Sequence, residues 1–351
     1  MADDGRSILT IDPAAIAANW RVLADRAAPG ACAAVLKADA YGCGAAAIAP
    51  ALWAAGCRDF FVAHLDEGVV LRALLPAARI AVLNGLAPGT LAEFEAHDLT
   101  PVLNDLGQIA LWRGRPQPAM VHLDTGMNRL GLGPDEQERL AADPPRDLAV
   151  SHWLTHLACA DEPEHPMNAA QAARFRAIIA RLPPAATSLA NSAGLHLGPG
   201  FASDLARPGV ALYGGWAAPG LRPVLRLQAR VLQVRHVDRG MTVGYGAAHS
   251  VAQPGKVATI AMGYADGYLR AAGASGRLCR IGGVPVPVIG RVSMDLVTLD
   301  VTGHEVAPGD LVDVLDGQWT VHDLAAAVGT IAYEILTGLG RRYRRRYEAW
   351  A

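Results

Sequence analysis

Lysine is almost absent from this 351-residue chain. Lysine and arginine together number 31, but only Lys37 and Lys256 are lysine, so nearly every positive charge is a guanidinium. The net charge is −2, and no basic cluster precedes the C-terminal run 341–347, which argues against nucleic acid as a partner. The chain also lacks an uncharged apolar stretch of about 18 residues and an apolar N-terminal segment, so we expect no membrane span and no secretory signal.

Cysteine is scarce as well, and its pattern excludes two kinds of cross-link. The chain has five cysteines, an odd number, and no Cys-x-x-Cys pair. These features predict free thiols in a reducing cytoplasm, with neither a disulfide framework nor a zinc site, and we expect no bound metal. The run 341–347, which holds five arginines and two tyrosines, is expected to be the solvated or interface end of a helix.

Lys37 is therefore the first candidate functional residue. A guanidinium is not deprotonated in proteins, whereas a lysine amine can act as a base, a nucleophile or a Schiff-base partner. Lys37 ends the apolar run 31–36 and precedes the turn-prone residues 38–42, which is a poor place for a solvated charge. We predict that Lys37 is catalytic, and that Lys256, which follows a Pro-Gly turn, is an ordinary surface charge.

Up to about residue 225, apolar runs typical of strands alternate with helical segments. Continuous apolar strands separated by helices indicate a parallel sheet, and eight repeats over about 215 residues match a closed (β/α)8 TIM-type barrel. An open doubly wound sheet is the alternative, but no Gly-x-Gly-x-x-Gly follows the first strand. The predicted strands are 33–37, 60–64, 80–84, 101–104, 120–124, 150–156, 188–191 and 206–212. The predicted helices include 13–26, 43–55, 66–75 and 170–182.

Beyond about residue 225 the pattern changes to alternating apolar residues punctuated by glycine and proline, which is typical of antiparallel strands. We predict an α/β barrel followed by a mostly-β C-terminal domain. The predicted boundaries are residues 10–225 for the barrel and 226–351, joined by residues 1–9, for the β-rich domain. The strands predicted in this domain are 227–237, 256–262, 277–281, 284–289, 294–301 and 311–315, and one helix is predicted at 322–339.

Polar side chains gather where the predicted barrel strands end. Working residues of such barrels lie at the carboxyl ends of strands, and the loops after strands seven and eight commonly hold a phosphate. Asn191 and Ser192 follow the seventh strand, and Arg207 and Gly209 lie in the eighth. A phosphate site beside a reactive lysine suggests pyridoxal phosphate. A sugar-phosphate aldolase would need the same combination, so the residues alone leave both readings open.

A series of motifs in the same order resembles the alanine racemase family from about residue 8 to residue 347. The segments that carry the resemblance are 35–42 (VLKADAYG), 124–131 (DTGMNRLG), 155–161 (THLACAD), 191–192 (NS), 207–214 (RPGVALYG), 243–246 (VGYG), 263–268 (GYADGY) and 291–295 (RVSMD). The resemblance implies a cytoplasmic pyridoxal-phosphate-dependent isomerase that interconverts L- and D-alanine, for peptidoglycan synthesis or for D-alanine catabolism. It also implies a homodimer with shared active sites.

The resemblance assigns roles to particular residues. Lys37 would hold the cofactor as a Schiff base and act with Tyr245 as the two catalytic bases. Arg129 would contact the cofactor's phenolate oxygen and the substrate carboxylate. The other cofactor contacts would come from Tyr41, His156, Asn191, Ser192, Arg207, Gly209 and Val210, and Tyr264, Met294 and Asp295 would lie around the substrate. Tyr245 and Met294 come from the partner subunit in this family.

Two bases on opposite faces of the cofactor can remove the Cα proton and return it without rotating the substrate. An amine of pKa about 10.4 and a phenol of pKa about 10 are both too basic at rest. Desolvation should lower the pKa of Lys37, and a positive field from Arg207 and His156 should favour the phenolate of Tyr245. Arg207 cannot pass a proton to the pyridine nitrogen, which should limit transamination.

Two positions depart from the family. Many members have a lysine two residues before the Asp-Thr-Gly that becomes carbamylated and braces the neighbouring arginine, and here that position is His122. We expect a bound anion such as chloride, or a nearby carboxylate, to brace Arg129 instead. Near the C-terminus, where some members use a tyrosine on the phosphate, the matching position is Arg341, with Tyr343 two residues later, so no phosphate contact is assigned.

Three other functions compete with alanine racemisation. A same-family racemase of another amino acid such as serine would differ in pocket size. A related decarboxylase usually has an acidic residue where Arg207 stands. A non-enzymatic pyridoxal phosphate carrier would lack the second domain and Tyr245 with it.

Overall fold

The computed structural model describes residues 6–274 and 279–350, and the chain divides into two units. One unit comprises Ile16–Leu212, and the other comprises Met1–Ala15 with Tyr213–Ala351. The residues thus described include no helix long and apolar enough to cross a membrane.

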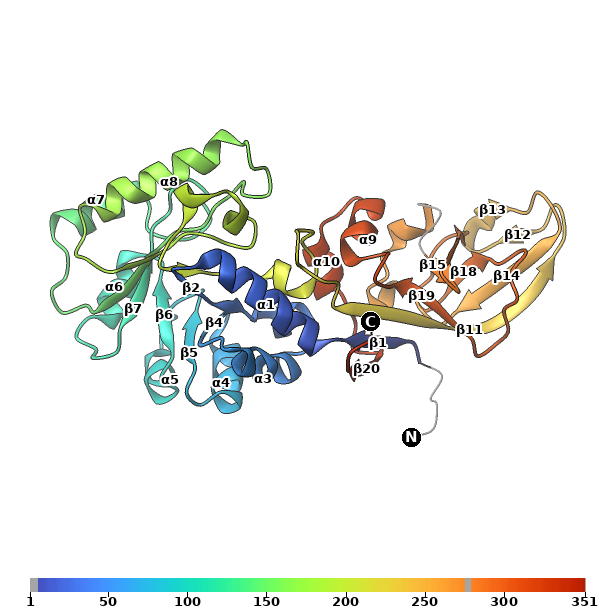
Figure 1. Ribbon diagram of the computed structural model, residues 1–351, viewed down its shortest axis with the longest axis horizontal. Coiled ribbons are helices and arrows are strands. Elements are labelled where there is room, and N and C mark those ends of the chain that lie inside the picture. Colours follow the sequence, from blue (N-terminus) through green and yellow to red (C-terminus); the bar gives the residue numbers. More distant parts are fainter. Residues whose placement is uncertain (1–5, 275–278, 351) are drawn as a thin grey trace. The chain divides into compact units, whose positions relative to one another are not determined.

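The first unit is built from parallel strands and the helices that follow them (Figure 1). Strands β3 to β9 form one parallel sheet in chain order. The strands are β2 (Ala31–Cys32), β3 (Ala34–Val35), β4 (Asp59–Val62), β5 (Arg79–Val82), β6 (Thr100–Leu103), β7 (Ala119–His122), β8 (Val150–Leu154), β9 (Ala186–Ser188) and β10 (Leu205–Ala206). The helices are α1 (Pro13–Ala27), α2 (Lys37–Tyr41), α3 (Ala45–Ala55), α4 (Leu65–Leu74), α5 (Leu91–Ala96), α6 (Leu106–Trp112), α7 (Pro134–Ala142) and α8 (Pro166–Ile179), with 3-10 turns η1 (Gly194–His196), η2 (Pro199–Phe201) and η3 (Val210–Tyr213).

Hydrogen bonds along β10 close this sheet into a barrel. The Ala33 amide, between β2 and β3, donates to the Ala206 carbonyl at 2.9 Å, and β2 pairs in parallel with β10. On the other side, the Arg207 amide donates to the Ala190 carbonyl, just after β9, at 2.9 Å. If β2 and β3 are counted as one strand, this strand and β4 to β10 make eight strands around the core. The predicted barrel is therefore confirmed.

The predicted eighth strand is too long at its carboxyl end. It was expected to reach residue 212, but β10 ends at Ala206 and the chain then forms η3. Pro208 has no N–H to donate to a sheet, which ends regular pairing there. The early end of β10 leaves Arg207 and Gly209 in a turn at the carboxyl edge of the barrel.

The second unit contains a nine-stranded sheet around the 13-residue strand β11 (Leu225–Val237), the longest arrow in Figure 1. Burial alternates along the first half of β11, as expected for a strand with one face on the core. The other strands of this unit are β1 (Ile8–Ile11), β12 (Thr242–Val243), β13 (His249–Ser250), β14 (Gly255–Ile260), β15 (Cys279–Ile281), β16 (Val284–Val286), β17 (Val288–Ile289), β18 (Val297–Asp300), β19 (Leu311–Leu315) and β20 (Arg344–Tyr347). The helical segments are η4 (Tyr245–Ala247), η5 (Tyr264–Asp266), η6 (Arg270–Ala274), α9 (Val321–Val328) and α10 (Ala332–Thr337).

Two expectations for this unit are wrong. The single helix expected at 322–339 is two helices, because Gly329 adopts a left-handed φ of 74° and ends α9. The C-terminal arginine run is not a helix end, since β20 pairs in parallel with β1, with Ile8 opposite Arg344. The backbone of β1 pairs with the end of this run on the edge that does not face β11.

Smaller differences concern strand bounds. The predicted strand 284–289 is divided into β16 and β17, and the one predicted at 294–301 begins only at Val297, which leaves Met294 in a turn. The predicted strand 277–281 begins outside the described residues, and β15 accounts for its later part.

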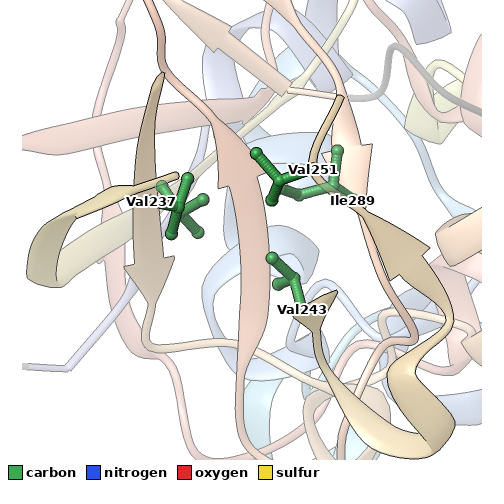
Figure 2. Close-up of a cluster of buried hydrophobic side chains, with 5 residues drawn as sticks. Val237, Val243, Val251 and Ile289 are labelled. Carbon is green, nitrogen blue, oxygen red and sulfur yellow. The ribbon is translucent and has the colours of Figure 1, made fainter. Parts of the chain in front are cut away.

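A small hydrophobic cluster anchors the hairpin that carries Tyr245. Its buried members come from the end of β11, the β12–β13 hairpin and its flank, β14 and β17. Figure 2 shows Val251 and Ile289 side by side, with Val243 next to them. The full set is Val237, Val243, Val251, Val257 and Ile289. Because Val243 lies two residues before Tyr245, this packing fixes one end of the exposed turn.

Candidate active site

Lys37 follows β3 directly and begins a left-handed turn. Leu36 continues the sheet, since its amide donates to the Phe61 carbonyl at 2.7 Å. The next residues have positive φ angles, with 55° at Ala38 and 54° at Tyr41. Left-handed geometry in non-glycine residues costs about 1–2 kcal/mol each. Such local strain persists only where surrounding contacts fix the backbone. The resulting turn places Lys37 at the carboxyl end of the barrel.

Glu67 in α4 supplies the contacts that hold this turn. Its Oε1 accepts from the Ala38 amide at 2.6 Å, and its Oε2 accepts from the Ala63 amide, just after β4, at 2.8 Å. Asp39 contributes from within the turn, because its Oδ1 accepts from the Ala45 amide at the start of α3 at 2.7 Å. The sequence analysis missed Glu67. Its position as an acidic residue in the first turn of a helix after a strand was the available signal.

The Lys37 amine lies in an environment that favours its neutral form. Burial lowers its pKa, and the Arg129 guanidinium lowers it further, while Glu67 acts in the opposite direction. A lysine with a lowered pKa is a better proton acceptor near neutral pH. This agrees with the role expected for Lys37.

The segments after β9 and β10 converge with Tyr41. The buried Ser192 Oγ accepts from the Gly209 amide at 2.9 Å and from the Ala211 amide at 3.3 Å. A Cβ atom at Gly209 would lie 2.2 Å from the Tyr41 hydroxyl oxygen, so only glycine allows this approach. Asn191 holds the adjoining turn, since its Oδ1 accepts from the Gly194 amide at 2.9 Å. The Tyr41 and Ser192 hydroxyls therefore lie together at the turn of Gly209, and hydroxyl groups can donate to a phosphate.

Arg207 is a buried cation with no acidic partner. One Nη donates to the Thr155 carbonyl at 2.6 Å, and the other donates to the Ser188 hydroxyl. In the described part of the chain no carboxylate lies within ion-pair distance of its guanidinium, and burial lowers its pKa to about 10. An uncompensated buried charge is costly. The site therefore favours a ligand that offers an acceptor or a negative charge to Arg207, as a pyridine nitrogen and its phosphate would.

His156 is held neutral beside Arg207. Burial lowers its pKa well below the ordinary value, and the charges of Arg207 and Arg129 add to the effect. An Arg207 Nη lies 3.4 Å from His156 Nδ1, which places the lone pair on Nδ1 and the ring proton on Nε2. A neutral His156 would add no charge to the positive field that we expected from it and Arg207.

Asp124 organises the turn that carries Arg129. Its carboxylate accepts from the amides of Gly126, Met127 and Asn128 at 3.0, 2.9 and 2.9 Å. Arg129 itself is exposed, and no described residue places a carboxylate within ion-pair distance of it. No carboxylate of the described residues therefore braces Arg129, and a bracing anion stays a prediction.

Gln171 in α8 joins the ends of β7 and β8, and the sequence analysis missed it. Its side chain is fully buried, and its Nε2 donates to the Thr125 hydroxyl at 3.1 Å and to the His156 carbonyl at 3.0 Å. The Thr125 and Thr155 hydroxyls are 2.8 Å apart. A glutamine on the apolar face of a helix was the only sequence signal for this link.

His122 replaces the family's lysine with a neutral ring of fixed tautomer. The Asn104 amide nitrogen donates to the Leu83 and Val102 carbonyls at 3.0 and 2.8 Å, so its Oδ1 must accept the proton of His122 Nδ1 at 2.9 Å. Burial and the charge of Arg207 lower the pKa of His122 to about 4.

The pKa of His122 predicts an acid-sensitive stability. Because the folded pKa is below the unfolded value of about 6.5, the unfolded chain binds a proton first, and stability falls as pH falls from 6.5 towards 4. We expect this group to account for about 2–3 kcal/mol of that loss. Urea unfolding at several pH values, in wild type and His122→Gln, measures it. An equal pH slope in both proteins would contradict the assignment.

The candidates in the second unit lie on exposed turns. Tyr245 is 72% exposed and stands between Gly244 and Gly246, whose φ angles are 79° and 68°. The Arg291 guanidinium packs on this turn, since a Cβ at Gly246 would lie 3.0 Å from its Nη1. The other candidates of this unit, Tyr264, Met294 and Asp295, are exposed as well.

Family comparisons identify the chain. The family model of the alanine racemase N-terminal domain matches residues 11–216, and that of the alanine racemase C-terminal domain matches residues 224–347. The chain belongs to the alanine racemase family. The resemblance drawn from the motifs is therefore confirmed.

Individual members of the alanine racemase family match nearly the whole chain. The alanine racemase of Acidiphilium cryptum is 55% identical, over 96% of this chain and 97% of that protein. That of Rhodospirillum rubrum is 49% identical, over 98% and 96%. The crystal structure of alanine racemase from Bartonella henselae with covalently bound pyridoxal phosphate superposes with a TM-score of 0.93 at 39% identity, covering 97% of this chain and 99% of that one.

Proposed function

We propose that this protein interconverts L- and D-alanine and that pyridoxal phosphate is its cofactor. Family membership and the 55% identical relative support the reaction. The observation that carries the cofactor assignment is the buried Arg207, which has no acidic partner and lies in the same barrel as Lys37 and the Tyr41–Ser192 donor set. The covalently bound cofactor in the Bartonella structure supports it further.

Each barrel residue then has a defined task. Lys37 supplies the amine that attaches the cofactor, and the cofactor withdraws electrons from the Cα–H bond of the bound amino acid. Tyr41, Asn191, Ser192 and the backbone of Gly209 and Val210 hold the phosphate. Arg207 would donate to the ring nitrogen, and the neutral His156 would lie beside the ring. Arg129 binds the substrate carboxylate and the phenolate oxygen of the cofactor.

Two side chains move the Cα proton in this proposal. Lys37 serves one face of the substrate, where its lowered pKa makes it an effective acceptor. Tyr245 serves the other face through its hydroxyl. Arg207 keeps its own proton because a guanidinium does not ionise at physiological pH, which limits protonation of the ring and with it transamination.

We infer a homodimer in which Tyr245 and Met294 complete the partner's site. Of the thirteen large hydrophobic side chains exposed among the described residues, ten belong to the second unit, including Tyr245, Tyr264 and Met294. A higher share of exposed apolar side chains in one unit favours an interface on that unit. We place the enzyme in the cytoplasm, because all five cysteines are free and four are buried.

A racemisation assay of the purified holoenzyme over a panel of L-amino acids tests this function. We expect alanine to give the highest kcat/KM, with serine at least about tenfold lower, because one added hydroxyl is a small but measurable change for a fitted pocket. Alanine may be followed in both directions by chiral chromatography. A higher kcat/KM for serine would favour the alternative, a serine racemase of the same family, and release of CO2 would indicate a decarboxylase.

The proposed reaction is compatible with two cellular roles. We propose that the enzyme supplies D-alanine for peptidoglycan or degrades D-alanine as a nutrient. Expression in a bacterium that requires D-alanine tests the first role, and growth on D-alanine as the carbon source tests the second. A non-enzymatic carrier would support neither.

A further inference from the structure

Three backbone segments of the second unit meet beneath Tyr264 and Met294. The Tyr264 amide donates to the Ser293 carbonyl at 3.1 Å, and the Ala265 amide donates to the Met294 carbonyl at 3.0 Å. The segment after α10 joins them, since the Gly340 amide donates to the Asp266 carbonyl at 3.0 Å. The turn 263–267, the turn 293–296 and the segment 338–342 therefore form one hydrogen-bonded group, which we call the three-segment junction.

Glycines allow the segments of this junction to touch. A Cβ at Gly263 would lie 2.3 Å from the Met294 carbonyl oxygen. At Gly267, where φ is 93°, a Cβ would lie 2.0 Å from the Gly338 carbonyl oxygen. No other residue fits at either place without moving the backbone. These close contacts therefore fix the distances between the backbone segments of the junction.

The Arg342 guanidinium bridges two carboxylates across the junction. Its Nε lies 3.1 Å from Asp266 Oδ1, and its Nη1 donates to Asp295 Oδ1 at 2.7 Å. Asp266 belongs to the turn of Tyr264, and Asp295 follows Met294 in the chain. One rigid planar cation therefore ties together the two turns that present Tyr264 and Met294.

The two carboxylate oxygens of Asp266 have different partners. Its side chain is buried, and its Oδ2 accepts from the Gly263 amide at 2.9 Å, which leaves Oδ1 for Arg342. Burial raises the pKa of Asp266, whereas the Gly263 amide and Arg342 act to lower it. Arg342 and Asp295 are about half exposed, and ion pairs at such positions contribute little to stability. The bridge is therefore better suited to set geometry than to stabilise the fold.

We propose that Arg342 is a positioning residue, which holds the Tyr264 and Met294 turns in the register needed to bind the substrate. The proposal rests on the proposed function and on the expectation from the family resemblance that these two side chains lie around the substrate. In this proposal Arg342 acts through the two turns and not by contact with substrate or cofactor. Its loss would displace both turns together and weaken alanine binding, while leaving Lys37 and the phosphate contacts in the barrel intact.

Steady-state kinetics of the Arg342→Gln holoenzyme tests the proposal. We expect KM for L- and D-alanine to rise roughly tenfold to a hundredfold, with kcat reduced less than about threefold, because displaced binding groups weaken substrate positioning. Cofactor content and Tm should stay near wild type. Arg346→Gln is the matched control, since it removes an exposed arginine of β20 whose only ion pair with a described residue is the 3.8 Å contact with Glu348.

Further variants separate this proposal from a purely structural role. Arg342→Lys keeps the charge but cannot bridge both carboxylates, so we expect an intermediate KM. Asp295→Asn should raise KM by itself and add little when combined with Arg342→Gln, because both changes break the same bridge. An unchanged KM in Arg342→Lys and Arg342→Gln, or a loss of Tm without any KM effect, would overturn the proposal.

Comparison with the substrate-contacting side chains tells the two hypotheses apart. If wild type racemises alanine and Tyr264→Ala and Met294→Ala raise KM, but the Arg342 variants do not, the positioning role of Arg342 is wrong and the proposed function stands. If wild type does not racemise alanine, the proposed function fails first.

Discussion

Replacing Lys37 by alanine is expected to lower the racemisation rate by at least about 10³-fold, because general acid–base catalysis alone contributes about 10²–10⁴-fold and the cofactor also loses its attachment. Burial and Arg129 lower the pKa of this amine, so a larger fraction of it is neutral and able to accept a proton near neutral pH. The rate is measured for both enantiomers by chiral chromatography. Borohydride reduction followed by mass spectrometry should find no cofactor on the chain.

The chain offers a matched control for this experiment, since Lys256 is its one other lysine. Lys256→Ala should keep wild-type activity, because the residue lies in β14 and the family motifs give it no role. Lys37→Arg keeps the positive charge but has no primary amine and remains protonated, so we expect it to be as inactive as Lys37→Ala. Substantial activity in Lys37→Arg would show that only the charge matters.

Tyr245→Phe is expected to slow racemisation by about 10²–10⁴-fold, since it removes one hydroxyl that serves as a catalytic acid or base. The side chain is 72% exposed in the single chain, so the loss of the hydroxyl should leave Tm nearly unchanged. Tyr347→Phe, at a residue 42% exposed on β20, is the control and should remain active. Equal rates for Tyr245→Phe and wild type would contradict the assignment of the second base.

Mixed dimers show whether Lys37 and Tyr245 act from different subunits. An equal mixture of Lys37→Ala and Tyr245→Phe chains, allowed to exchange, would contain half heterodimers, each with one intact site. About a quarter of wild-type activity should return if the sites are shared across a two-fold interface. No recovery, in a mixture shown to exchange, would place both residues in the same chain's site.

Much of the fold could be predicted because its signals are local. Apolar runs and helical spacing located all eight barrel strands, and the change to alternation after residue 225 located β11 and its neighbours β14 and β19, but not its third neighbour β1. The errors arose where the outcome depends on a distant partner. The C-terminal arginines form β20 because β1, more than 300 residues earlier, offers them an edge. The break at Gly329 was a local signal that the apolar helical pattern concealed.

The candidate site shows the same division. Lys37, Ser192 and Arg207 could be found because each stands at a strand end, where the barrel gathers its working residues. Glu67, Gln171 and Arg342 could not, because their importance lies in hydrogen bonds to segments far away in sequence. Each was an ordinary polar residue on a helix or a loop until the fold brought its partners close.

His122 illustrates a limit of reasoning from a family pattern. The motif located the position, but the neutral tautomer depends on Asn104, whose own amide is fixed by two strand carbonyls. A residue 18 positions away thus decides which proton His122 carries. The sequence could suggest that Arg129 needs a different brace, and only the structure could show that no described residue places a carboxylate beside it.

Exchange of the Cα proton with D2O tests the two-base account most directly. Wild-type holoenzyme should exchange the proton of both L- and D-alanine, as followed by NMR or mass spectrometry. In Tyr245→Phe we predict that one enantiomer still exchanges, because Lys37 serves its face, while exchange of the other falls by about 10²-fold or more. Full exchange of both enantiomers in Tyr245→Phe, with none in Lys37→Ala, would contradict the account and leave Lys37 as the single base.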